Sequence, residues 1–282
     1  MELKKIILGF LLFLALPMAG GPPQPLYAEA IIKIGGAGSA LGTMRLLAES
    51  FEKSHPGVKV QILPSLGSPA GLKAALDGRI EIGLSSLPLT AEERKRGALE
   101  REYGKSPFIF VTNKNTQVSS LSTNDLVEIY RAERLTWPDG TRIRLVLRPE
   151  SDIDTDILKQ ISPGMDEAVK AALSRKGMIV ALTNQESDQL VETITGALGA
   201  STLSQIISEK RSSKILSFNG VKPSLKTFAD GTYPLGKPFY LITPVKISEP
   251  VWMFIDFVGS PKGRQILLEN GHWVRQERNS PR

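Results

Sequence analysis

Apolar and polar positions follow a repeated order near the start of this chain. Three times in the first ninety residues, a short apolar run is followed by a loop of small polar residues and then by a helix-like pattern. The apolar runs are residues 31–34, 58–63 and 80–84, and the loops after them are residues 35–39, 64–68 and 85–88. Short apolar runs that alternate with helices predict buried strands in a parallel sheet.

The three loops share a chemical character. Each presents serine hydroxyls and backbone N–H groups at the start of a helix, where the helix dipole favours negative charge. In an open parallel sheet, the carboxyl ends of the strands meet at one edge, and ligands bind there. The pattern therefore predicts a site for a small anion or a strongly polar ligand.

The rest of the chain continues the alternation, so the predicted fold class is α/β. Further strands are expected at residues 107–112, 143–147, 178–182, 214–218 and 238–243. Helices are expected at residues 41–51, 69–77, 90–96, 122–130, 166–175, 185–195, 250–258 and 261–269. Ser68 is expected to cap the second helix, because Pro69 suits the first helical position and Gly78 suits the end.

Residues 1–30 have the pattern of a signal peptide. Lys4 and Lys5 precede an uncharged apolar run over residues 6–19, and Ala28-Glu29-Ala30 supplies an A-x-A cleavage site. The run is shorter than the roughly 20 residues that span a bilayer. Cleavage after Ala30 is expected, with cleavage after Ala28 and a retained anchor as the alternatives. The mature protein is then expected to be soluble and periplasmic.

The composition narrows the range of possible functions. The chain of 282 residues has no cysteine, which excludes disulfides, thiolate metal sites, a cysteine nucleophile and a lipid-modified cysteine. Its formal net charge of +6 favours anionic ligands, but the cations are scattered, so nucleic-acid binding is not expected. His55 and His272 lie beside residues typical of element ends, and we expect exposed capping positions for both.

Motifs for cofactors and catalysis are missing from the sequence. Gly36 and Gly38 follow a strand, but the next glycine is Gly42, one residue late for G-x-G-x-x-G. The chain contains no G-x-x-x-x-G-K-[ST], no H-E-x-x-H and no G-x-S-x-G pattern. We therefore expect no cofactor, no metal site and no enzymatic activity.

Several segments, in their order along the chain, resemble one family. The segments are residues 38–39, 67–74, 77–83, 85–89, 121–130, 137–140, 231–235, 238–241 and 260–263, together with Phe257 and Gly271. Together they are similar to the phosphate-type periplasmic binding proteins of ABC importers, over nearly all of the chain after residue 30. The resemblance implies two α/β lobes, a ligand cleft between them, and closure by a hinge.

The resemblance also implies boundaries and partners. Lobe one would comprise residues 31–110 and 240–276, lobe two residues 111–239, and residues 277–282 would form a polar tail. Two crossover strands would join the lobes near Phe108–Thr112 and Phe239–Thr243. The function implied is capture of phosphate or a similar small oxyanion, by a monomer, for an ABC permease in the inner membrane. The alternative is a sensory or scaffolding module that binds a different polar ligand.

Binding residues follow from the resemblance, position by position. The first lobe offers hydroxyls and amides, and the second offers an arginine and the loop after it. The residues are Ser39, Ala40, Gly67, Ser68 and Ser86 in the first lobe, and Arg148, Ser151, Asp152 and Asp154 in the second.

Two positions depart from the family pattern. Ser86 stands where family members commonly carry an acid that accepts the proton of hydrogen phosphate, and residues 150–154 are acidic where a Gly/Ser/Thr-rich turn is expected. Carboxylates beside a dianion repel it unless they are protonated or paired. Three interpretations stay open: an aspartate of this loop accepts the ligand proton, Asp152 or Asp154 caps a helix from Thr155 and faces away, or the ligand carries donor or positive groups.

Overall fold

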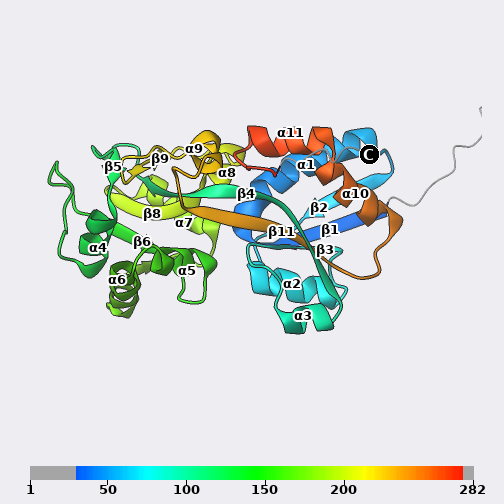
Figure 1. The fold of residues 1–282 in the computed structure, drawn as a ribbon, viewed down its shortest axis with the longest axis horizontal. Coiled ribbons are helices and arrows are strands. Elements are labelled where there is room, and N and C mark those ends of the chain that lie inside the picture. Colours follow the sequence, from blue (N-terminus) through cyan, green and yellow to red (C-terminus); the bar gives the residue numbers. More distant parts are fainter. Residues whose placement is uncertain (1–29, 276–282) are drawn as a thin grey trace, which may run out of the picture.

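Helices and strands alternate along residues 30–275, which are the residues that the computed structural model describes (Figure 1). The expected signal peptide and polar tail lie outside this range. The strands are β1 (Ala30–Gly36), β2 (Val58–Ile62), β3 (Ile82–Ser85), β4 (Ala98–Thr112), β5 (Ser120–Leu121), β6 (Arg144–Leu147), β7 (Ile179–Val180), β8 (Ala197–Thr202), β9 (Lys214–Ile215), β10 (Ser217–Phe218) and β11 (Gly236–Pro244).

The three strand–loop–helix units expected at the start are present. A short 3-10 helix, η1 (Gly38–Ala40), precedes the first long helix. The α-helices are α1 (Leu41–Ser54), α2 (Ser68–Leu76), α3 (Ala91–Lys95), α4 (Thr123–Arg131), α5 (Ile153–Gln160), α6 (Pro163–Ser174), α7 (Asn184–Thr193), α8 (Leu203–Ser208), α9 (Leu225–Ala229), α10 (Glu249–Gly259) and α11 (Pro261–Glu269).

Within residues 30–275, one large sheet has the order β2-β1-β3-β11-β4-β8-β6-β7, with β9 also paired to β4, and β5 pairs with β10 in a small separate sheet. At one end β1 is parallel to β2 and β3, and at the other end β6 is parallel to β7 and β8. In the middle, the long strands β4 and β11 are antiparallel to each other and to their outer neighbours. The chain therefore has two α/β halves joined by two long strands.

Each half has its own hydrophobic core. One cluster includes Phe51, Leu84 and Phe254, and helices α1, α10 and α11 cover one face of its sheet while α2 and α3 lie at the other face (Figure 1). The other cluster includes Phe110 and Trp137. We call the part around the first cluster the first lobe and the part around the second cluster the second lobe.

The strands cross between the lobes slightly away from the expected positions. Residues 98–107 of β4 pair with β11, and residues 108–112 pair with β8. The amide of Phe108 donates to the carbonyl of Leu235 (3.1 Å), so the two crossings lie side by side. The expected crossover segments, Phe108–Thr112 and Phe239–Thr243, lie inside the second and first lobes instead. Their apolar composition marks burial within a core, and it does not mark the crossing.

Some elements were not expected from the pattern. Strand β8 and helix α8 were missed, because the buried run Ala197–Thr202 consists mainly of small residues with low strand propensity. Helix α5 begins at Ile153, two residues before the expected start at Thr155. No helix within residues 30–275 is long and apolar enough to cross a membrane.

His272 is a correction to the sequence analysis. It is fully buried, not exposed, and its Nε2 lies 3.0 Å from the hydroxyl of Thr43. Burial lowers the pKa of His272 to about 3, so the imidazole stays neutral near neutral pH. His55 does follow the last residue of α1, but it is half-buried and its ring stacks on Phe51. No group of three or more possible metal ligands occurs in the part of the chain that is described.

Candidate functional site

A pocket of about 130 Å³ lies between the lobes. It is lined by the loop residues Ala37 and Gly38 of the first lobe and by residues at the starts of three helices, α2, α5 and α7. Arg148 and Lys237 complete the lining. The first few N–H groups of a helix have no partner within the helix, so three helix starts bring open donors to one place.

At the start of α2, the residues adopt roles different from those expected. Gly67 takes the N-cap position with φ of 76°, a conformation that favours glycine, and Ser68 is the first helical residue. The hydroxyl of Ser68 does not cap the helix, because it accepts a hydrogen bond from the amide of Ser86 (3.0 Å). The first backbone bond within this turn runs from Gly71 to Gly67 (3.0 Å), and Pro69 has no N–H. The amides of Ser68 and Ala70 are therefore the open ones here.

Of the other first-lobe candidates, Gly67 lines the pocket, whereas Ser39, Ala40 and Ser86 do not. Ser39 and Ser86 are buried and do not line the pocket, and neither hydroxyl has a hydrogen-bond partner among residues 30–275. The amide of Ala40 donates to the carbonyl of Ala37 (3.1 Å), and the amide of Gly67 donates to Gly36 (3.0 Å). These two amides are engaged by the backbone, unlike those of the first residues of α2.

Arg148 lies at the pocket, directly after β6. Its side chain is only 6% exposed. One terminal nitrogen donates to the carbonyl of Ala181 (2.6 Å) and the other to Asp152 Oδ2 (2.5 Å). The buried Nε has no partner within the described residues. The guanidinium is thus held from one side, with one N–H left without an acceptor.

The acidic loop is compensated by bonds inside the protein. Asp152 lines the pocket and is the N-cap of α5, where its Oδ1 accepts from the amide of Asp154 (2.9 Å). Its other oxygen accepts from Arg148, so both carboxylate oxygens have partners. Glu150 and Ser151 are exposed, and neither lines the pocket. The capping interpretation therefore describes Asp152, but this residue faces the pocket and not away from it.

Asp154 is buried behind the pocket in an ion pair. Its Oδ1 lies 2.5 Å from the ammonium of Lys237, and its Oδ2 accepts from the side-chain amide of Asn184 (2.8 Å). The side chains of Asp154 and Lys237 are each 1% exposed. Lys237 and Asn184 were missed as site residues. The pattern Thr183-x-x-Glu186 could have indicated the start of α7, because the hydroxyl of Thr183 accepts from the Glu186 amide (3.1 Å). No local sequence signal indicates the role of Lys237.

The two lobes touch beside the pocket. Gln185, at the start of α7, donates its side-chain amide to the carbonyl of Gly38 (2.9 Å) and to Glu209 Oε1 (2.8 Å). A Cβ atom on Gly38 would lie 2.7 Å from Gln185 Oε1 and 3.0 Å from Asn184 Oδ1. The absence of a side chain at residue 38 therefore allows this contact between the lobes.

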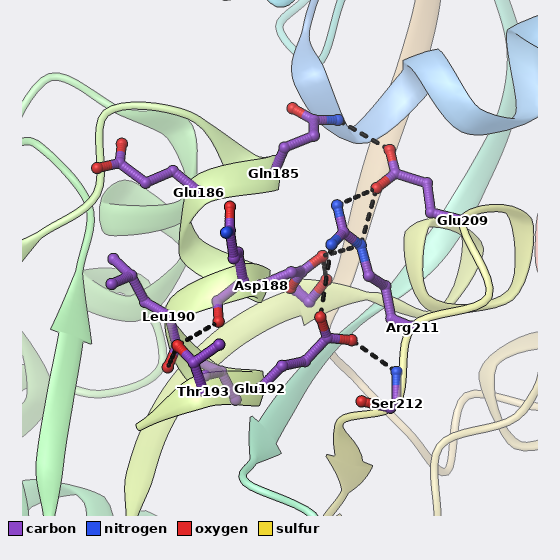
Figure 2. A network of polar contacts seen from close by, with 12 residues as sticks. Gln185, Glu186, Asp188, Leu190, Glu192, Thr193, Glu209, Arg211 and Ser212 are labelled. Carbon is purple, nitrogen blue, oxygen red and sulfur yellow. Dashed lines mark hydrogen bonds and ion pairs between the residues drawn. The ribbon is translucent and has the colours of Figure 1, made fainter. Parts of the chain in front are cut away.

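A polar network continues from this contact into the second lobe (Figure 2). Arg211 donates to Glu209 (2.6 Å from Nη2) and lies 3.5 Å from Glu192 and 3.9 Å from Asp188. Three carboxylates thus surround one guanidinium. Burial raises the pKa of Asp188 to about 7, although the hydrogen bond from Ser201 and the charge of Arg211 oppose the rise.

Comparisons with known proteins agree on the family. A family model described as PBP superfamily domain matches residues 23–262. The phosphate-binding protein PstS of Borreliella burgdorferi is 25% identical over 256 residues, which cover 86% of this chain and 89% of the relative. PstS of Bacillus subtilis is 24% identical over 257 residues, with coverages of 87% and 81%.

Solved structures share the fold. A Clostridium perfringens protein described as a phosphate ABC transporter substrate-binding protein with bound phosphate superposes with a TM-score of 0.74. It is 25% identical, and the alignment covers 87% of this chain and 100% of that one. An ABC-type phosphate transport receptor from Vibrio cholerae has a TM-score of 0.60 at 22% identity, with coverages of 87% and 100%. With most of its length matched by the family model and with this two-lobed fold, the chain belongs to the PBP superfamily.

Proposed function

We propose that this protein captures phosphate, or a similar small oxyanion, in the pocket between its lobes and delivers it to an ABC importer. The names of the relatives support phosphate as the ligand, since both curated proteins are phosphate-binding proteins. Two similar solved structures are described as a transporter substrate-binding protein and a transport receptor, so we propose reversible capture without chemical change.

A surplus of unpaired donors at one pocket is the observation that carries this proposal. The Nε of Arg148 is buried without a partner in the described chain, and three helix starts leave backbone amides open around it. Buried polar groups are normally hydrogen-bonded, and a buried donor without a partner costs about 1–3 kcal/mol. An oxyanion supplies several acceptors at once, and charge-assisted bonds to it are the strong ones.

The hydroxyls of Ser39 and Ser86 belong to the same proposal. Both are buried without a partner among residues 30–275, and their neighbours Gly38 and Ser68 line the pocket. We propose that they donate to the oxyanion, together with Ser68 and the open amides of α2. Because Asp152 is paired with Arg148, the carboxylate that lines the pocket does not leave a bare negative charge there.

Location and organisation complete the proposal. Residues 1–30 would direct export, and the mature protein would act outside the inner membrane, in the periplasm, as a monomer that an ABC permease receives. The lobes would be bounded within a few residues of the positions expected from the sequence, with the boundaries at the crossings near Phe108 and Leu235. Ligand binding would then stabilise the closed form, in which Gln185 of one lobe contacts Gly38 of the other.

A panel of ligands tests the function. Thermal unfolding is measured with phosphate, sulfate, molybdate and small organic acids, and calorimetry then gives the affinity of each ligand that shifts the midpoint. A ligand that binds only the folded protein stabilises it by about 2.7 kcal/mol at a hundredfold excess over Kd. We expect phosphate to raise the midpoint most. No shift with any oxyanion would contradict the proposal.

A further inference from the structure

Lys237 places a second cation at the pocket, from a strand that connects the lobes. It lies near the start of β11, close to the crossing at Leu235, and it lines the pocket together with Arg148. Its side chain is 1% exposed, although lysine is almost never fully buried unless it is paired. Burial of an ammonium at this position therefore needs a reason.

The ion pair with Asp154 accounts for only part of the ammonium. One N–H of Lys237 is directed to Asp154 Oδ1, at an N···O distance of 2.5 Å. An ammonium has three donors, and the other two have no acceptor among residues 30–275. The second oxygen of Asp154 is taken by Asn184, which fixes the carboxylate in place (2.8 Å). The geometry is that of a cation held on one side and unsatisfied on the others.

We propose that Lys237 is a ligand-binding residue that donates to the bound oxyanion alongside Arg148, with Asp154 and Asn184 as its positioning residues. This inference rests on the proposed function and names a further residue of that site. Asp154 neutralises the ammonium while the pocket is empty, since an unpaired buried charge would be costly. When an oxyanion enters, the free N–H groups of Lys237 gain their acceptors.

The alternative is a purely structural ion pair. In that case the only task of Lys237 is to balance Asp154, and removal of both charges leaves ligand binding unchanged. Calorimetry with inorganic phosphate separates the two roles. The affinity is measured for four proteins: the parent, Lys237→Gln, Asp154→Asn and the double variant. Lys170→Gln is the matched control, because Lys170 forms an exposed ion pair with Asp166 (2.7 Å) on α6. The melting temperature of each variant is measured without phosphate.

The expected results follow from the unsatisfied donors. Lys237→Gln lowers the melting temperature, because it leaves Asp154 buried without a cation. The double variant recovers most of that stability but binds phosphate at least tenfold more weakly than the parent. Asp154→Asn binds phosphate more tightly than the parent, because the ammonium is no longer neutralised. Lys170→Gln binds as the parent does.

Each contrary result has a definite meaning. A double variant that binds phosphate as tightly as the parent makes the ion pair structural and overturns the role of Lys237. Should the double variant fail to fold, Asp154→Asn decides, because unchanged or weaker phosphate binding in that variant also overturns the role. If the parent protein binds no phosphate, the proposed function itself is wrong. This outcome differs from equal binding by the parent and the double variant, which overturns only the role of Lys237.

Discussion

Gln185 and Gly38 form a hydrogen bond across the gap between the lobes, with the side-chain amide of Gln185 donating to the carbonyl of Gly38 (2.9 Å). The two residues are far apart in the sequence and belong to different lobes. Because residue 38 lies at the pocket and lacks a side chain, the second lobe can approach the first one there. This contact ties closure of the lobes to the same loop that we propose to bind the ligand.

Gly38→Ala and Gly38→Val should weaken phosphate binding without a large effect on the empty protein. The new Cβ meets Gln185 and Asn184 of the other lobe, and it also meets Ser65 Oγ of its own lobe, a short side chain that can rotate away in the empty protein. We expect a several-fold loss of affinity for alanine and a loss of tenfold or more, about 1.4 kcal/mol, for valine. Calorimetry measures the affinity and thermal unfolding measures the stability.

Gly259→Ala is the control for this pair of variants. A Cβ on Gly259 meets nothing within 4 Å, so the same methyl group is added in open space. This variant should bind phosphate as the parent does. Equal affinity of Gly38→Val and the parent would contradict the idea that contact at residue 38 accompanies ligand capture.

Arg148→Lys should weaken phosphate binding by tenfold or more. A guanidinium binds an oxyanion through parallel N–H groups that an ammonium cannot reproduce. Some stability should be lost as well, because the carbonyl of Ala181 and the carboxylate of Asp152 both accept from Arg148. Arg131→Lys, in an exposed ion pair with Glu167, is the control. Calorimetry that finds the same affinity in Arg148→Lys and the parent would remove Arg148 from the site.

Alanine variants of the three serines should differ in whether they lower only the phosphate affinity or also the melting temperature. Ser39→Ala and Ser86→Ala remove hydroxyls that have no protein partner in the described chain, so the empty protein should keep its melting temperature. Their phosphate affinity should fall, since each leaves a ligand oxygen unpaired at a cost of about 1–3 kcal/mol. Ser68→Ala should lower the melting temperature too, because its hydroxyl accepts from the Ser86 amide. Unchanged affinity in all three variants would exclude the hydroxyls from the site.

Local order in the sequence predicted most of the fold, and it predicted only part of the site. Apolar runs, glycines and capping residues locate strands and helix starts, because these are set within a few residues. The position of Arg148 directly after a strand is local too, but its expected place at the pocket came from the family resemblance. The pairing of Lys237 with Asp154 joins residues 83 positions apart, and no local pattern encodes which side chain a buried lysine will meet.

The acidic loop, residues 150–154, is a second case in which local sequence was not enough to predict the structure. Its composition suggested that its carboxylates repel an anionic ligand. Whether they do depends on their partners, most of which lie elsewhere in the chain. Lys237 neutralises Asp154, whose other oxygen accepts from Asn184, while Arg148 neutralises Asp152. The role of Ser68 also differs from the expected one. Its hydroxyl accepts from the Ser86 amide in the next loop, and Gly67 takes the N-cap position instead.

Asp188 and His272 should give the stability opposite dependences on pH. The pKa of Asp188 is raised to about 7 by burial, so its contribution to stability is lost as the pH rises from about 4 to 7. The pKa of His272 is lowered to about 3 by burial, so the unfolded state binds more protons between about pH 3 and 6.5 and stability rises with pH there. In the parent protein the two effects oppose each other over most of this range.

Single variants should reveal each slope. Asp188→Asn leaves the His272 effect alone, so stability should rise with pH between 4.5 and 6.5 more steeply than in the parent, by up to about 1.4 kcal/mol per pH unit. In His272→Gln only the Asp188 effect remains, so the stability should fall as the pH rises through the same interval. Urea unfolding at three pH values measures the slopes. Parallel pH profiles in the parent and Asp188→Asn would show that Asp188 does not titrate in this range.

Asp152→Asn tests how the pocket distinguishes oxyanions. Asp152 is the one carboxylate among the described residues that line the pocket. Both oxygens of Asp152 accept from protein donors, but each keeps a second lone pair that can accept the proton of hydrogen phosphate. Sulfate carries no such proton and gains no hydrogen bond from this carboxylate. Asparagine caps a helix as well as aspartate does, so α5 should keep its start in this variant. The variant should gain affinity for sulfate and lose affinity for phosphate, and its melting temperature without ligand should fall because the buried Arg148 loses its anionic partner.

The contrast with Asp154→Asn makes this test specific. Asp154 does not line the pocket, so its removal should change the affinity for phosphate and sulfate in the same direction, through Lys237. Only Asp152→Asn should therefore change the ratio of the two affinities, because only that residue faces the ligand proton. Calorimetric titration of both variants with phosphate and with sulfate gives the ratios. If Asp152→Asn keeps the parent's ratio, the aspartate is a helix cap and a partner of Arg148, and selection for a protonated ligand must come from another group.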